Sequence, residues 1–109
     1  MIAMVLNAVV TFLGTDQGGR ATAPASGYRP PVWFGDTGAS GEPMLWDFEF
    51  QFTGAHADGE VPLSEEVPAR MRAVSATPDD VAVGVGATFE VREGARVVGR
   101  GRVLQVLPE

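Results

Sequence analysis

The chain has 109 residues, the usual size of one domain, and 45% of them are hydrophobic, which is enough to build a packed core. Its formal net charge of −6 argues against a protein that holds nucleic acid through bulk electrostatics, because such binding needs many cations that face phosphates. The absence of cysteine excludes disulfides, thiolate zinc sites and a cysteine nucleophile, and it favours a cytoplasmic protein.

Glycines and prolines lie between apolar runs, which predicts many short strands joined by turns. A first strand is expected over 4–13, where β-branched and aromatic residues run up to a glycine. A loop over 16–24 leads to a second strand, which begins at or after Pro31 or lies at an edge, because proline cannot donate to the ladder. Tyr28 and Arg29 then lie at the mouth of this strand.

The clearest pattern lies between Met44 and Phe52, where aromatic residues alternate with acidic and amide residues. We expect the aromatic side of this strand to be core. The alternative is a base-stacking surface, but acids rather than cations flank the aromatic residues, which disfavours RNA stacking. The aromatic positions are Trp46, Phe48, Phe50 and Phe52.

The acidic, glycine-rich segment 53–66 is expected to form an exposed loop with a short strand around 61–63. Residues 68–74 alternate as a strand does, with Arg70 and Arg72 on one side, and residues 78–80 predict a turn. No apolar run approaches the roughly 20 residues that a membrane helix needs.

The last part of the chain predicts a hairpin, with strands over 87–92 and 97–107 joined near Gly94. A two-residue loop would pair Phe89 with Arg100 and point Arg100 toward the apolar side, whereas a bulged loop would shift that pairing by one residue. The sequence leaves both registers open. About six strands without a helical period predict an all-β fold, a single antiparallel β-barrel over 1–109.

The expected first strand ends in Thr-Phe-Leu at 11–13 and is followed by Gly-Gly-Arg at 18–20 and Gly-Tyr-Arg-Pro at 27–30. The closing run FEVREGARVVGRGRV lies at 89–103. In this order, these segments resemble the C-terminal (third) domain of elongation factor Tu. The middle, 35–86, has no clean counterpart in the family, and this departure favours a free-standing relative over a fragment of a larger GTPase.

The resemblance implies a β-barrel with binding functions. In the family this domain packs against the rest of the factor, touches the T stem of aminoacyl-tRNA and meets the nucleotide-exchange factor. The guanine-nucleotide motifs belong to the family's first domain, so neither nucleotide binding nor GTP hydrolysis is expected here. The tRNA-contacting turn of the family matches Arg92, Glu93 and Gly94.

Six residues are therefore candidates for contact with RNA or a protein partner: Arg92, Glu93, Gly94, Arg96, Tyr28 and Arg29. Structural explanations stand beside this one. Gly94 is also explained by a turn that needs positive φ, Tyr28 by capping of the barrel, and Arg29 by pairing with a carboxylate. Arg100 and Arg102 replace apolar residues of the family pattern and are candidates for a basic strip beside Arg92.

No catalytic chemistry, cofactor or metal site is expected. His56 is the single histidine, and adjacent acids such as Asp79 and Asp80 point to opposite faces of a strand. The first hypothesis is a binding module for tRNA or a protein of the translation machinery. The second is a regulatory barrel that imitates the third domain without binding RNA, and the third is a self-associating barrel.

Overall fold

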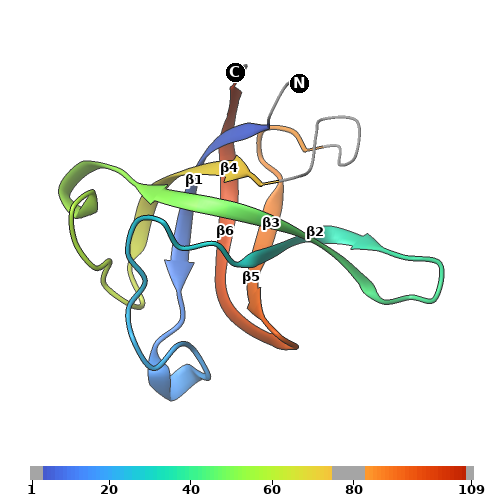
Figure 1. Cartoon of the computed structure of the whole chain (residues 1–109), viewed down its shortest axis with the longest axis horizontal. Helices are drawn as coiled ribbons and strands as arrows, with labels where there is room; N and C mark the ends of the chain where they lie inside the picture. Colours follow the sequence, from blue (N-terminus) through green and yellow to red (C-terminus); the bar gives the residue numbers. More distant parts are fainter. Residues whose placement is uncertain (1–3, 75–82, 108–109) are drawn as a thin grey trace.

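The computed structural model describes residues 4–74 and 83–107. Six antiparallel strands close into a barrel in the order β1-β4-β3-β2-β5-β6 (Figure 1). The strands are β1 (Val5–Phe12), β2 (Pro31–Thr37), β3 (Pro43–Phe52), β4 (Glu66–Ala73), β5 (Thr88–Glu93) and β6 (Arg96–Leu107). Two short 3-10 helices, η1 (Thr15–Gln17) and η2 (Gly54–His56), lie in the loops after β1 and β3. The expected all-β barrel of six antiparallel strands is confirmed.

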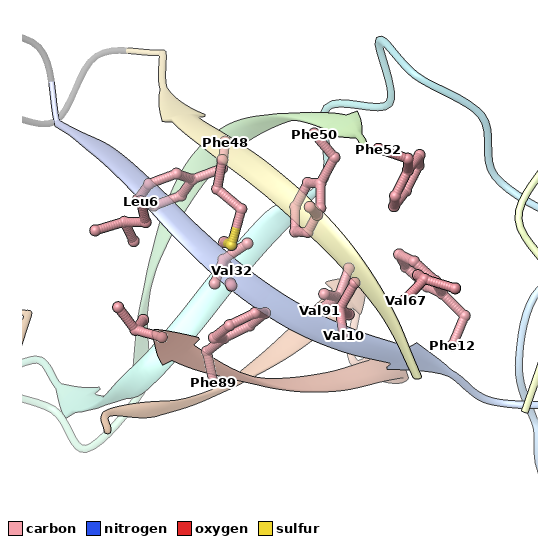
Figure 2. Close-up of a cluster of buried hydrophobic side chains, with 14 of the residues drawn as sticks. Leu6, Val10, Phe12, Val32, Phe48, Phe50, Phe52, Val67, Phe89 and Val91 are labelled. Atoms are coloured by element: carbon pink, nitrogen blue, oxygen red, sulfur yellow. The ribbon is translucent and has the colours of Figure 1, made fainter. Parts of the chain in front are cut away.

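The core of the barrel comes from the inward side of each strand. Phe48, Phe50 and Phe52 of β3 are buried, as Figure 2 shows, and Trp46 packs partly against the same cluster. The prediction that this aromatic stripe is core is confirmed. Burial of side chains of this size contributes about 1.5–3 kcal/mol each. The alternation of β4 is also confirmed, because Met71 is buried between two exposed arginines.

The first and last strands lie side by side, since β1 pairs with both β4 and β6. β2 pairs with β3 and, over a much shorter stretch, with β5. The end of β2 and the start of β3 leave the barrel as an extended hairpin, here called the β2–β3 arm (36–45), which points away to the right in Figure 1. Met44 and Leu45 of this arm are exposed.

The prediction of a short strand around 61–63 is wrong. Val61 is only 1% exposed, and its N–H donates to the carbonyl of Pro24 at 3.0 Å outside any described strand. The loop pairs in the manner of a sheet at one isolated β-bridge, between Ala25 and Glu60, which does not extend into a strand. Val61 therefore anchors the loop by burying its side chain. The expected turn at 78–80 lies outside the described residues.

The closing hairpin contains both the two-residue turn and the bulge that the sequence analysis considered as alternatives. Glu93 lies opposite Arg96 across a two-residue turn, but the register shifts between Arg92 and Val91, so that Val91 pairs with Gly99. This bulge places Phe89 opposite Gly101 and leaves the side chain of Arg100 exposed. Within the described ranges, no helix has the length and apolar composition required to cross a membrane.

Candidate binding site at the end of the barrel

The loop after β1 brings an arginine to the end of β5. Gly18 closes the helix η1 in the left-handed conformation, with φ of 84°. Gly19 then passes so close to the preceding strand that a Cβ there would lie 2.1 Å from the carbonyl oxygen of Leu13. The two glycines thus allow a backbone path that a larger residue would block, and the next residue, Arg20, lies against β5.

Arg20, Tyr28 and Glu93 meet at this end of the barrel. The hydroxyl of Tyr28 donates to Oε2 of Glu93 at 2.5 Å, and Nη1 of Arg20 donates to the same oxygen. The guanidinium carbon of Arg20 also lies 4.6 Å from the centre of the Tyr28 ring, a cation–π contact. These three residues are called the Arg20–Tyr28–Glu93 network below.

The network is attached to the core through Tyr28. Its ring makes edge contact with Phe12, with centroids 5.9 Å apart, and a tilted contact with Phe50 at 6.1 Å. The backbone of Tyr28 is held as well, because its carbonyl accepts the N–H of Phe50 at 2.8 Å. The hydroxyl therefore has a fixed position from which to hold Glu93.

The surroundings of the network shift the pKa of each member. Partial burial alone would raise the pKa of Glu93, but the hydrogen bonds from Tyr28 and Arg20 outweigh it and the pKa lies below its ordinary value. Burial is the main cause that raises the pKa of Tyr28, and the hydrogen bond to Glu93 raises it further. For Arg20, burial lowers the pKa, yet the bonds to the two partners leave it raised. At neutral pH the network holds a cation, a neutral phenol and a carboxylate.

The β5–β6 turn continues directly from the network. Gly94 has φ of 64°, in the left-handed region that favours glycine, and it is exposed together with Ala95. Arg96 begins β6, and its Nη2 lies 3.7 Å from Oε1 of Glu93. The side chain of Arg96 is 55% exposed, so its guanidinium stays accessible to a partner.

Two predicted site residues lie elsewhere. Arg92 points to the outer face of β5, where Nε and Nη2 donate to Oε1 of Glu90 at 3.1 and 2.8 Å. Its guanidinium carbon lies 4.9 Å from the centre of the Trp33 ring. Arg29 pairs with Glu49 of β3, with Nη2 2.8 Å from Oε2. The hydrogen bond from Gln51 is the main cause that lowers the pKa of Glu49, and the hydrogen bond from Arg29 lowers it further.

Of the six predicted site residues, the structure brings four together: Tyr28, Glu93, Gly94 and Arg96. Arg20 was not among them, although it makes the ion pair that organises the group. The Gly-Gly-Arg run at 18–20 was the available signal, because a glycine pair before an arginine marks an unusual backbone path. Its partner Glu93 lies 73 residues away, a separation that local patterns do not report.

The basic strip expected around Arg100 and Arg102 lies on the outer face of β6. Arg100 is opposite Glu90, and Arg102 is opposite Thr88. Neither arginine forms an ion pair within 4–74 and 83–107. Glu90, which lies between Arg92 and Arg100, offsets part of the positive charge of the strip.

No protein-family model matches the sequence. In the portion of the chain that the structure describes, no group of three or more His, Cys, Asp or Glu side chains gathers in a way that could hold a metal ion.

Proposed function

We propose that the chain is a non-catalytic binding module, which contacts tRNA or a protein of the translation machinery through the β5–β6 turn. One observation carries this proposal: the Arg20–Tyr28–Glu93 network fixes the base of the turn, while Gly94, Ala95 and Arg96 remain exposed. A turn held in one conformation loses less entropy when it binds a partner. The resemblance to the third domain of elongation factor Tu supports the translational assignment.

The RNA version of the proposal is supported by the local charge of the turn. Arg20 and Arg96 outweigh the single carboxylate of Glu93, although the whole chain is acidic. A glycine turn also exposes backbone N–H groups beside the guanidinium of Arg96, an arrangement suited to phosphate oxygens. Charge is separated along the chain, because residues 36–66 contain most of the acidic residues and no arginine.

A gel-shift titration with aminoacyl-tRNA at several salt concentrations tests the RNA version. We expect affinity to fall as salt rises, and Arg96→Ala to weaken binding and to lower the salt slope by about one. Arg70→Ala is the matched control, since Arg70 is exposed on the outer face of β4, away from the turn. Absence of binding at low salt, or equal effects of the two variants, would contradict the RNA version.

A second candidate is a protein-interaction barrel that occupies a surface meant for the third domain of elongation factor Tu. The exposed Met44 and Leu45 of the β2–β3 arm, at 39% and 40%, support it together with the net charge of −6. Calorimetric titration with elongation factor Tu that lacks its third domain tests this candidate. Heat of binding that disappears in Leu45→Asp supports it, and an absence of heat with the intact chain counts against it.

Either version would place the protein in the cytoplasm, where translation occurs. Fractionation of cells that express the chain would check this location, and recovery outside the cytoplasm would contradict both versions.

A further inference from the structure

The β2–β5 seam is the shortest of the barrel. Its pairing consists of Val32 with Val91 and Trp33 with Glu90, whereas every other pair of neighbouring strands shares a longer ladder. β2 departs from β5 at Gly35, whose φ of 99° is a conformation that side chains rarely adopt. Beyond this glycine, β2 continues as the β2–β3 arm (Figure 1).

Where this seam ends, no strand among residues 4–74 and 83–107 pairs with that side of the β5 backbone, so it forms an open edge of the described barrel. The carbonyl of Ala87 accepts the N–H of Val103 at 2.8 Å and therefore points toward β6, and Thr88 lies opposite Arg102 of that strand. Polar groups alternate in direction along a strand, and the N–H and C=O of Thr88 therefore point to the opposite side, toward β2. The register would place Gly35 opposite Thr88, but the ladder between the two strands stops two pairs earlier, at Trp33 and Glu90.

A groove of about 290 Å³ lies at this open edge. Apolar side chains from both strands, Phe34 of β2 and Phe89 of β5, are in tilted ring contact with centroids 5.9 Å apart and form its floor. Trp33 and Thr88 line its sides. The groove thus combines an unpaired strand edge with an apolar floor, two features that receive an extended peptide.

The charged side chains that line the groove indicate which kind of peptide it binds. Two charged side chains line the groove, Glu90 and Arg100. Glu90 is already paired with Arg92, whose Nη2 lies 2.8 Å from its Oε1, whereas Arg100 is exposed and forms no ion pair among the described residues. A nucleobase fits less well, because the guanidinium of Arg92 already covers the Trp33 ring and Nε1 of Trp33 already donates to the carbonyl of Asp36 at 2.6 Å. An apolar and acidic peptide matches both the floor and the free cation.

We propose that this groove binds an extended segment of an acidic partner protein, which adds as a strand to the edge of β5 beside Thr88. One large apolar side chain of the segment packs onto the floor formed by Phe34 and Phe89, and the next residue, an acid, points outward to Arg100. Adjacent residues of a strand face opposite sides, so the apolar and acidic residues are neighbours in the partner's sequence. The site is separate from the β5–β6 turn and does not depend on the function proposed for that turn.

The probe is the capped peptide Ac-Thr-Phe-Asp-Val-Thr-NH2, titrated into the full chain while backbone amide signals are followed by NMR. We expect saturable shifts at the β2–β5 seam, with a downfield shift of the Thr88 amide and its protection from hydrogen exchange. A peptide with Asp replaced by Lys should bind on the order of tenfold more weakly. Methylation of the peptide nitrogen that pairs with β5 should abolish binding, because it removes a ladder hydrogen bond.

Arg100→Glu should reverse the charge preference, so that the Lys peptide binds more tightly than the Asp peptide. Arg102→Glu is the matched control, since it is exposed on the same face of β6 but does not line the groove. Its binding of the Asp peptide should stay within about twofold of the original chain, a margin that allows for long-range charge effects.

Three results would overturn the proposal. The first is an absence of shifts at the seam at millimolar peptide, and the second is equal weakening by Arg100→Glu and Arg102→Glu. The third is a set of seam shifts produced by uridine monophosphate but not by the peptide, which would assign the groove to a nucleotide instead.

Discussion

The hydroxyl of Tyr28 donates a hydrogen bond to Glu93 across 65 residues of chain and thereby joins the segment before β2 to the end of β5. Oε2 of Glu93 accepts this bond and also the bond from Arg20, so one carboxylate oxygen holds two segments that the barrel ladders do not connect. The geometry of the β5–β6 turn depends on this convergence.

Tyr28→Phe should lower the free energy of unfolding by about 1–2 kcal/mol, because it leaves a charged acceptor with one donor fewer while the ring keeps its packing. Urea unfolding checks this value. Glu49→Gln is the control, since the side chain of its partner Arg29 is 63% exposed and solvent screens a surface pair of this kind. A loss in Tyr28→Phe no larger than in the control would contradict the role given to the hydroxyl.

Acid should weaken the barrel through Glu93. Its pKa in the folded state lies below the ordinary value of 4.5, so the network stabilises the fold fully above that value and loses its contribution as the pH falls through the folded pKa. Thermal unfolding between pH 7 and pH 3 should show a fall in stability at the acid end that is shallower in Glu93→Gln. Parallel curves for the two proteins would contradict this assignment.

Tyr28 is the single tyrosine of the chain, which allows its ionisation to be followed directly by ultraviolet absorbance. Burial and the hydrogen bond to Glu93 raise its pKa above the ordinary value of 10.0. Stability linked to this group is therefore complete below pH 10 and is lost as the pH rises toward the folded pKa. We expect tyrosinate to form together with alkaline unfolding, and ionisation of the folded protein near pH 10 would refute the expectation.

Gly19→Ala should displace the loop that presents Arg20. A Cβ at this position would meet the carbonyl oxygen of Leu13 at 2.1 Å, and the backbone must shift to relieve the contact. We expect a loss of about 1–3 kcal/mol. Gly59→Ala is the matched control, because a Cβ at Gly59 would have nothing within 4 Å. Chemical denaturation of the two variants gives the comparison, and equal stability of both would show that the close approach has no cost.

Phe50→Ala tests whether the aromatic stripe of β3 serves only as core. Phe50 is fully buried and contacts Phe12, Tyr28 and Phe52, so we expect a loss of about 3–5 kcal/mol. Gln51→Ala, on the exposed side of the same strand, should change stability by less than about 0.5 kcal/mol. Unfolding monitored by circular dichroism measures both values, and similar small losses would contradict the assignment of Phe50 to the core.

The strands of the barrel could be predicted because each follows a local pattern. The alternation from Met44 to Phe52 has the period of a strand, and the apolar runs on either side of Gly94 predict the closing hairpin. The register of that hairpin could not be predicted, since the bulge beside Val91 depends on how Gly99 and Gly101 pack against the neighbouring strands.

The candidate site was predicted only in part for a related reason. Glu93, Gly94 and Arg96 are consecutive or nearly so, and a turn motif brings them to attention. Arg20 contacts Glu93 although the two residues are far apart in the sequence. Arg92 lies on the other face of β5, next to Glu90, because successive side chains of a strand point to opposite faces. The apolar character of Val61 predicts a strand, whereas its burial depends on the contact with Pro24, a distant residue that the local sequence does not report.

The adjacency of β1 and β6 has a consequence for the order of folding. Val5 lies opposite Leu107 and Thr11 opposite Arg100, so β1, the earliest of the six barrel strands in chain order, pairs on one side with β6, the latest of them. Until β6 emerges, one edge of β1 is an unpaired template that other chains can join, and closure of the barrel must bring together segments from nearly opposite ends of the described chain. Because this pairing joins residues so far apart in the sequence, we expect it to slow the folding of the barrel.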